Sequence, residues 1–147
     1  MKKFFLTIVA ILTLLLGGCQ GNNETDISAY SDDIAKTQEI AVVSSDTSEV
    51  IETITSKDDI EDFILALDMD KWKLETLPDN AIEMGSFDLK QEKTIKYGQT
   101  DTGDGTLYDV ATITLYDGPY IGFEIGGLNM TFAVNEDVID FLNGYFE

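Results

Sequence analysis

Apolar and polar side chains alternate most regularly in the last third of the chain. The alternation is interrupted at Asp117-Gly118-Pro119, which has the composition of a three-residue turn. Folding the chain back at this turn brings apolar residues opposite one another: Ala111 with Ile125, Ile113 with Phe123 and Leu115 with Ile121. The pattern therefore predicts two antiparallel strands that share one apolar face.

A second turn, at Gly126-Gly127, extends the same sheet. It places three more apolar pairs on that face: Ile125 with Leu128, Phe123 with Met130 and Ile121 with Phe132. A shift of one residue would move every side chain to the opposite face, so the agreement of the two turns supports this register. We expect the other face to be polar and open to solvent, with Thr112, Thr114, Tyr116, Tyr120, Gly122, Glu124, Asn129 and Thr131 on it.

Two segments have the periodicity of amphipathic helices. Ser56 and Asp59 have the form of a capping box before a helix over residues 57–68, whose apolar stripe is Ile60, Phe63, Ile64 and Leu67. The acids in its first turn suit the helix dipole and need no functional explanation. Asn135 is placed to cap a second helix, whose apolar residues are Val138, Ile139, Leu142, Tyr145 and Phe146.

The remaining apolar positions predict further strands. A β-branched segment over residues 49–55 is one, and shorter alternating segments contain Trp72, Leu74 and Leu77, then Phe87 and Leu89, then Ile95 and Tyr97. We interpret Trp72 as a core residue. The fold class predicted is α+β, a two-layer domain in which two amphipathic helices pack on one face of an antiparallel β-meander. The alternative is a closed barrel with a helical lid.

The first residues have the pattern of a signal peptide. Lys2 and Lys3 precede an apolar run over residues 4–16, which is shorter than the about 20 residues that span a bilayer. The sequence Leu16-Gly17-Gly18-Cys19 then resembles the lipobox of bacterial lipoproteins. An ordinary secreted protein with a free Cys and a retained membrane helix are the alternatives.

The resemblance to a lipoprotein implies a membrane anchor. Residues 1–18 would be removed as the signal peptide, and Cys19 would carry a diacylglyceryl thioether at the new N-terminus, because two acyl chains anchor stably where one does not. The protein would then lie on the extracytoplasmic face of a bacterial membrane. Its organisation is similar to that of small Gram-positive surface lipoproteins whose domain has no known function.

The chain after Cys19 divides into two parts by composition. Residues 19–46 are polar and acidic, with one ambiguous apolar patch at Ile40-Ala41-Val42-Val43, and we expect a flexible tether there. Residues 47–147 are long enough for a single small domain.

The charge and composition exclude several classes of function. The formal charge is −19, and loss of Lys2 and Lys3 with the signal peptide would make it −21, which argues against nucleic acid as a partner. The absence of His excludes Ser-His-Asp and Cys-His sites, and one Cys allows neither an intramolecular disulfide nor a Cys-rich zinc site. Paired carboxylates stay open among 28 acids, but a small domain with one hydrophobic layer rarely forms the deep cleft they need. We therefore expect a protein that is not an enzyme.

A Gly-rich acidic segment suggests a calcium site. Asp101, Asp104 and Asp109 are candidate ligands, because calcium prefers carboxylate and carbonyl oxygens from one loop. The spacing does not fit an EF-hand, since Asp104-Gly105 at loop positions 5 and 6 would put Ala111 at position 12. The alternative is the tip of a β-hairpin with no metal.

Tyrosines on the predicted polar face suggest a binding surface. Tyr116 and Tyr120 would pair across the hairpin, with Tyr108 on the same side if the strand stays regular, and tyrosines are common anchors in protein interfaces. The alternative is that they only stabilise the sheet. The function expected is a non-enzymatic protein-binding or accessory module on the membrane, with a calcium-dependent surface protein or an inhibitor of a secreted enzyme as alternatives.

Overall fold

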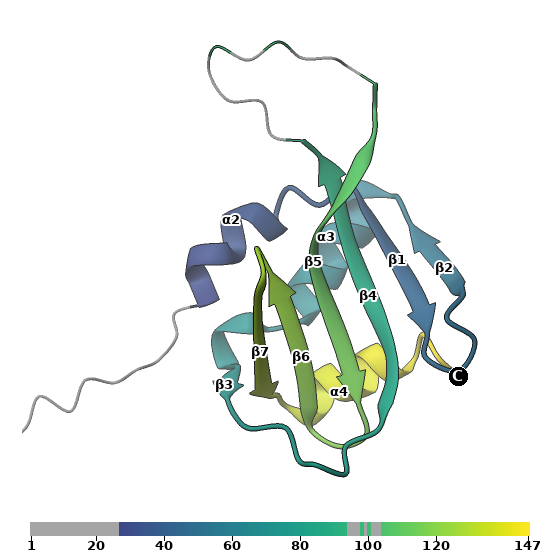
Figure 1. Ribbon diagram of the computed structural model, residues 1–147, viewed down its shortest axis with the longest axis vertical. Coiled ribbons are helices and arrows are strands. Elements are labelled where there is room, and N and C mark those ends of the chain that lie inside the picture. The colour runs from purple at the N-terminus through teal and green to yellow at the C-terminus, as the bar shows by residue number, and fades with distance from the viewer. Residues whose placement is uncertain (1–26, 94–97, 99, 101–103) are drawn as a thin grey trace, which may run out of the picture.

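A seven-stranded antiparallel sheet forms the framework of the protein (Figure 1). The structure is a computed structural model that describes residues 27–93, 98, 100 and 104–147. Its elements are η2 (Ile27–Tyr30), α2 (Ser31–Ile34), β1 (Glu39–Ser44), β2 (Val50–Ile54), α3 (Lys57–Ala66), η3 (Met69–Lys71), β3 (Lys73–Leu74), β4 (Glu83–Glu92), β5 (Leu107–Tyr116), β6 (Tyr120–Ile125), β7 (Leu128–Ala133) and α4 (Glu136–Asn143). The strand order is β2-β1-β4-β5-β6-β7-β3, and every neighbouring pair is antiparallel.

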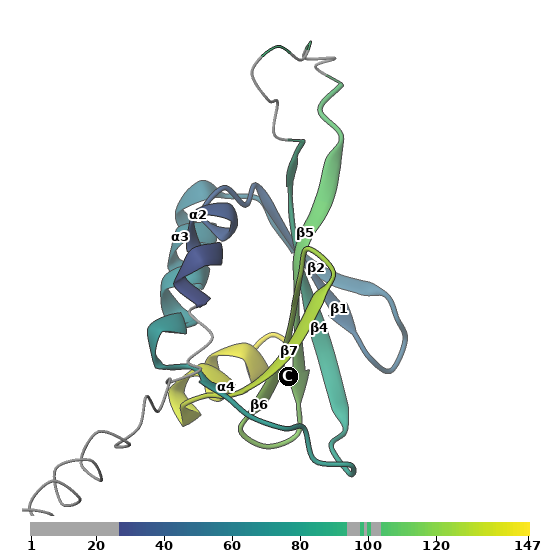
Figure 2. The same ribbon diagram turned by 60° about the vertical axis from the view of Figure 1, so that its left-hand side comes forward.

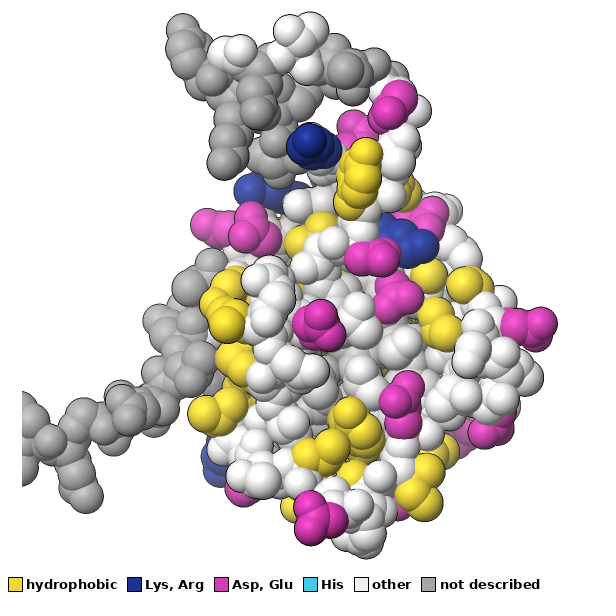
Figure 3. Space-filling view, viewed as in Figure 1, with side chains coloured by type: hydrophobic (Ala, Val, Ile, Leu, Met, Phe, Trp, Pro, Cys, Tyr) yellow, Lys and Arg dark blue, Asp and Glu magenta, His cyan; other side chains and the backbone are white. Residues whose placement is uncertain are grey.

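The helices lie on one side of the sheet, as Figure 2 shows. The core between the helices and the sheet is built from aromatic and aliphatic side chains, among them Phe63 of α3, Leu142 of α4, and Phe87, Phe123 and Phe132 of the sheet. Burial of this apolar surface is the main force that holds the helices on the sheet. The chain is therefore α+β. Figure 3 views the sheet from its other side, which the described helices leave open.

The predicted pairing of the last three large strands is confirmed. Strands β5 and β6 pair as Ala111 with Ile125, Ile113 with Phe123 and Leu115 with Ile121. Strands β6 and β7 pair as Ile121 with Phe132, Phe123 with Met130 and Ile125 with Leu128. Gly126 and Gly127 both have positive φ, of 57° and 82°, which the tight turn between right-twisted strands requires.

Both predicted helices are present, with slightly different ends. Helix α3 begins after Ser56, whose Oγ accepts a hydrogen bond from the backbone nitrogen of Asp59 at 3.5 Å, as the capping box predicted. Asn135 occupies the corresponding position before α4, but its side chain makes no capping hydrogen bond. Val138 and Leu142, two residues of the predicted apolar stripe of α4, are buried. Within the described residues no helix is long and apolar enough to cross a membrane.

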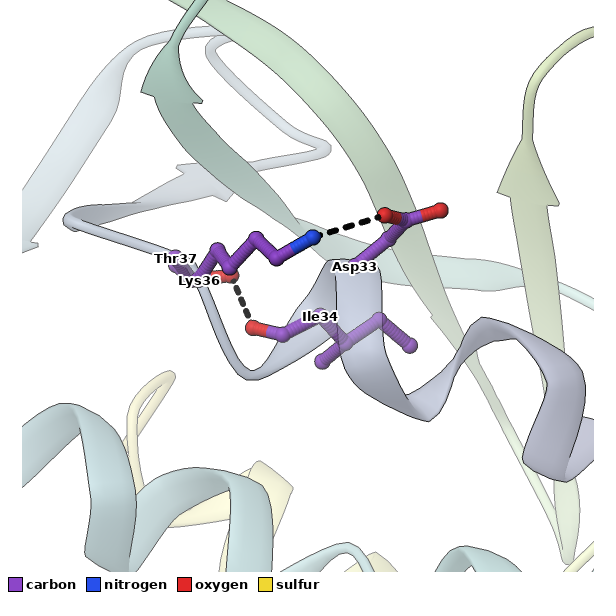
Figure 4. Close-up of polar contacts among 4 residues, drawn as sticks. All are labelled: Asp33, Ile34, Lys36 and Thr37. Carbon is purple, nitrogen blue, oxygen red and sulfur yellow. Dashed lines mark hydrogen bonds and ion pairs between the residues drawn. The ribbon is translucent and has the colours of Figure 1, made fainter. Parts of the chain in front are cut away.

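The segment predicted as a tether is part of the domain from Ile27 on. Strand β1 lies between β2 and β4, and its Ile40 and Val42 are fully buried, so the ambiguous apolar patch is a central strand. Ahead of β1, Oγ1 of Thr37 donates a hydrogen bond of 2.6 Å to the carbonyl oxygen of Ile34, the last residue of α2 (Figure 4). The predicted domain boundary at residue 47 is therefore corrected, because the described residues from Ile27 on belong to the domain, while residues 19–26 lie outside the described part.

Other strands also differ from the prediction. Phe87 and Leu89 belong to one ten-residue strand, β4, whereas Ile95 and Tyr97 lie outside the described residues. The segment after Trp72 forms the two-residue strand β3, which pairs with β7, and Glu75 adds a backbone hydrogen bond to Thr131. Because β2 and β3 are the two ends of the strand order, the sheet is open and the alternative of a closed barrel is wrong.

Candidate functional site: the open face of the sheet

The open face of the sheet is polar in its middle. Cross-strand neighbours share a face, so the register places Ser86 beside Thr114, and Gly122 beside Thr131, in one row across the sheet. In Figure 3 the middle of this face is mostly white, the colour of side chains that are neither apolar nor charged, and acidic side chains lie around it. Such a face exposes the sheet directly, because the described helices all pack on the other side.

The next row holds the polar contacts of the face. Thr112 donates from Oγ1 to Oδ1 of Asp88 at 3.0 Å, and Glu124 faces Thr112 from β6. Lys90 lies one row further and forms an ion pair with Glu39 at 3.7 Å. Asp109 faces Lys90 from β5, so four acids and one lysine in these two rows leave the surface negative.

Tyr116 and Tyr120 stand at the end of this face, next to the turn that joins β5 and β6. Both side chains are half-buried. A Cβ built on Gly122 would lie 3.4 Å from Cε2 and 3.6 Å from Oη of Tyr116, so the Tyr116 ring reaches diagonally over this glycine. Because Gly122 has no side chain, the Tyr116 ring can pack over it, and this packing restricts the positions that the ring can take.

Glu83 faces Tyr116 from β4. Partial burial raises the pKa of the Tyr116 phenol, and the negative charge of Glu83 raises it further. The phenol therefore stays protonated, and neutral, well above neutral pH.

Two exposed apolar residues flank Glu83. Ile82 is 63% exposed and Met84 is 41% exposed. Asp117 ties this segment to the turn, because its carboxylate accepts from the nitrogen of Ile82 and its own nitrogen donates to the carbonyl oxygen of Ile82. Apolar side chains gather at this end of the face in Figure 3. We call Ile82, Met84, Tyr116 and Tyr120 the tyrosine patch.

Sequence reasoning missed Ile82, Glu83 and Met84. The register between β4 and β5 shifts between Glu83 and Gly85, so Met84 is an extra residue at a bulge. A bulge breaks the alternation that identifies a strand, and the sequence carried no other signal that placed this segment beside Tyr116.

Tyr108 does not join the tyrosine patch. It lies eight residues before Tyr116 on β5, a separation of roughly 26 Å along an extended strand. The register also shifts between Leu89 and Lys90, so the regular alternation on which its predicted side depended is interrupted. The prediction that Tyr108 shares one surface with Tyr116 and Tyr120 is wrong for this reason.

The predicted calcium ligands are not assembled in the described part of the chain. Asp104 accepts a hydrogen bond from the nitrogen of Thr106 at 3.0 Å, and this bond lowers the pKa of its carboxyl group. Asp109 faces Lys90 from β5. Asp101 lies outside the described residues, among which no cluster of three or more acidic or thiol side chains suits a metal. The structure therefore adds no support to a calcium site.

Cys19, the predicted lipidation site, also lies outside the described residues, as does the whole lipobox at residues 16–19.

Comparison with known proteins gives little. No family model and no curated protein matches the sequence. Among solved structures, the protein is similar to the crystal structure of a thioesterase-like protein from Clostridium sporogenes. The match has a TM-score of 0.40 and 14% sequence identity, and it covers 75% of this chain and 94% of that one.

This match corrects one expectation. The sequence predicted a protein that is not an enzyme, and similarity to a structure described as thioesterase-like overturns that exclusion, which we do not maintain. At this TM-score and identity the match assigns no activity to the chain.

Proposed function

We propose that the protein is a lipid-anchored lipoprotein of the extracytoplasmic membrane face, whose domain binds a protein partner through the tyrosine patch. The patch itself is the observation that carries this proposal. Exposed apolar residues, Ile82 and Met84, lie on either side of Glu83, which is opposite Tyr116. The half-buried tyrosines at this end of the sheet supply contact area with little loss of side-chain freedom.

The layer arrangement supports the proposal. We interpret the domain as a two-layer fold in which the amphipathic helices α3 and α4 cover one face of the antiparallel strands. The helices then bury the apolar face of the sheet, and the polar face, with the tyrosines at one end, stays available to a partner. The anchor rests on the lipobox at residues 16–19.

Affinity capture from the native membrane, after brief chemical crosslinking, tests both parts of the proposal. Full-length protein is compared with Tyr116→Ala/Tyr120→Ala, with Tyr108→Ala and with Cys19→Ala. Tyr108 is 51% exposed and lies far from the patch, so Tyr108→Ala makes the same chemical change at a matched site. Fluorescence of Trp72, the single tryptophan, checks that each variant is folded.

The proposal predicts that one protein is captured in near-equal amount by the wild type and by Tyr108→Ala, and lost from the double tyrosine variant. Cys19→Ala is expected to leave the membrane fraction. Equal capture by the double tyrosine variant would exclude the patch as the binding surface, and membrane retention of Cys19→Ala would exclude the lipid anchor.

A further inference from the structure

We propose that the partner segment that docks on the tyrosine patch is basic, and that it places a Lys or Arg side chain between the Tyr116 ring and the Glu83 carboxylate. The inference rests on the proposed function, of which it names the partner chemistry. Three features support it: the charges near the patch, the arrangement of lysines, and the packing of the Tyr116 ring over Gly122.

One acidic side chain lies at the patch, and two more lie two rows away on the same face. Glu83 and Glu124 are exposed, and Asp88 is half-buried on the same face. Glu83 stands directly opposite Tyr116 across β4 and β5. An acidic partner segment would meet the like charge of Glu83 here, whereas a basic one is attracted by it.

Most described lysines already have acidic partners. Ion pairs join Lys36 to Asp33, Lys57 to Glu61, Lys71 to Asp68 and Lys90 to Glu39. Apart from Lys90, none of these lies on the open face, so these four ion pairs leave Glu83 and Glu124 open to a cation from a partner.

Lys73 makes the two ends of the patch differ in charge. Strand β3 places Lys73 opposite Ala133, and Ala133 faces Tyr120 on its other side. The row across this end of the sheet therefore has an acid at β4, two tyrosines in the middle and a lysine at the β3 edge. A basic side chain is favoured at the Glu83 end and disfavoured at the Lys73 end, which fixes the orientation of the bound segment.

The position of the Tyr116 ring suits a cation. The ring is held over Gly122, and a Lys or Arg head group placed against an aromatic ring is attracted by its negative face. Glu83, the cross-strand partner of Tyr116 on β4, supplies a carboxylate to the same cation, so two weak attractions act on one group.

A titration with matched peptides tests the charge requirement. Full-length ¹⁵N-labelled protein in a neutral detergent is titrated at low salt with a hexapeptide that carries two arginines, and with the same peptide carrying citrulline, which keeps the shape of arginine without its charge. We expect the arginine peptide to shift the amide signals of Gly122 and the patch, with roughly three- to tenfold weaker binding of the citrulline peptide. Equal shifts from the two peptides, or no shift at millimolar peptide, would overturn the inference.

Variants separate this inference from the proposed function. Glu83→Gln is expected to weaken binding of the arginine peptide and to reduce capture of the membrane partner. Asp62→Asn makes an equal charge change on the exposed side of α3 and should leave peptide binding and partner capture unchanged. If the double tyrosine variant loses the partner while Glu83→Gln retains it, the binding surface stands and the basic-segment inference fails. If both variants retain it, both proposals fail. Patch signals that move with protein concentration alone would indicate a second copy as the occupant and contradict the inference.

Discussion

The indole nitrogen of Trp72 donates a hydrogen bond of 2.7 Å to the carbonyl oxygen of Leu67. Leu67 is the residue at which α3 ends, so the bond satisfies one of the carbonyl groups that the end of a helix leaves without an intrahelical partner. The ring itself packs against Phe123 and Phe132 at centroid distances of 5.7 and 5.4 Å. Trp72 therefore joins the end of α3 to the sheet, and the prediction that it is a core residue is confirmed.

Replacing Trp72 by Phe should destabilise the domain by about 2 kcal/mol. The variant loses the hydrogen bond to Leu67 and part of the buried ring. Urea unfolding followed by circular dichroism gives the free energy. Leu65→Ala is the control, because Leu65 is 76% exposed on α3 and its truncation should cost under about 0.5 kcal/mol. Equal losses in the two variants would contradict the assigned role of Trp72.

Gly85 is required by its neighbours. A Cβ at this position would overlap the ring of Phe146 and approach the carbonyl oxygen of Val43 to 2.7 Å. We expect Gly85→Ala to lower the free energy of unfolding by about 1–3 kcal/mol. Adding Phe146→Ala removes the ring overlap, so the double variant should be more stable than the sum of the two single losses predicts. Strict additivity in this cycle would show that the ring does not press on residue 85.

The two helix N-caps should differ in their contribution. Ser56→Ala removes a side-chain bond to Asp59 and should cost about 0.5–1 kcal/mol. Asn135→Ala removes no such bond and should cost less. Thermal melts of the two variants, measured in parallel, check the order, and a larger loss at Asn135 would be the contrary result.

Stability should fall when the pH rises above about 10, the ordinary pKa of tyrosine. Burial and the charge of Glu83 raise the pKa of Tyr116, and burial raises the pKa of Tyr145, so the folded state keeps these protons after the unfolded chain has lost them. The stabilisation is complete below pH 10 and is lost as the pH passes through the folded-state values. Tyr116→Phe should make the fall shallower, and NMR titration of the Tyr116 ring should show a lower pKa in Glu83→Gln than in the wild type. An unchanged pKa in Glu83→Gln would remove the assigned effect of that charge.

Sequence reasoning succeeded where local chemistry determines the structure. The two turns around β6 each combine special backbone needs with apolar residues in alternation, so turn and pattern gave one register. Ser56 succeeded for a similar reason, because a capping side chain acts within four residues of the chain.

The misses depend on distant contacts. Strand β1 reads as a short apolar patch within a polar segment, and only pairing with β2 and β4 on both sides makes it central. The bulges at Met84 and near Lys90 arise from fitting β4 against β5, and they decided which residues adjoin Tyr116 and that Tyr108 does not. The candidate site was thus half predicted: the two tyrosines came from the sequence, and their acidic and apolar neighbours came from the fold.

Site-specific photocrosslinking tests the central claim, that the tyrosine patch is the binding surface, most directly. A photoreactive benzoylphenylalanine replaces Ile82, which is exposed within the patch and leaves both tyrosines intact, or replaces Leu65, which is exposed on α3 on the helical side. Illumination of cells should give one discrete crosslinked product from position 82 and none of that size from position 65. The same product from both positions, or a product from position 65 alone, would contradict the account.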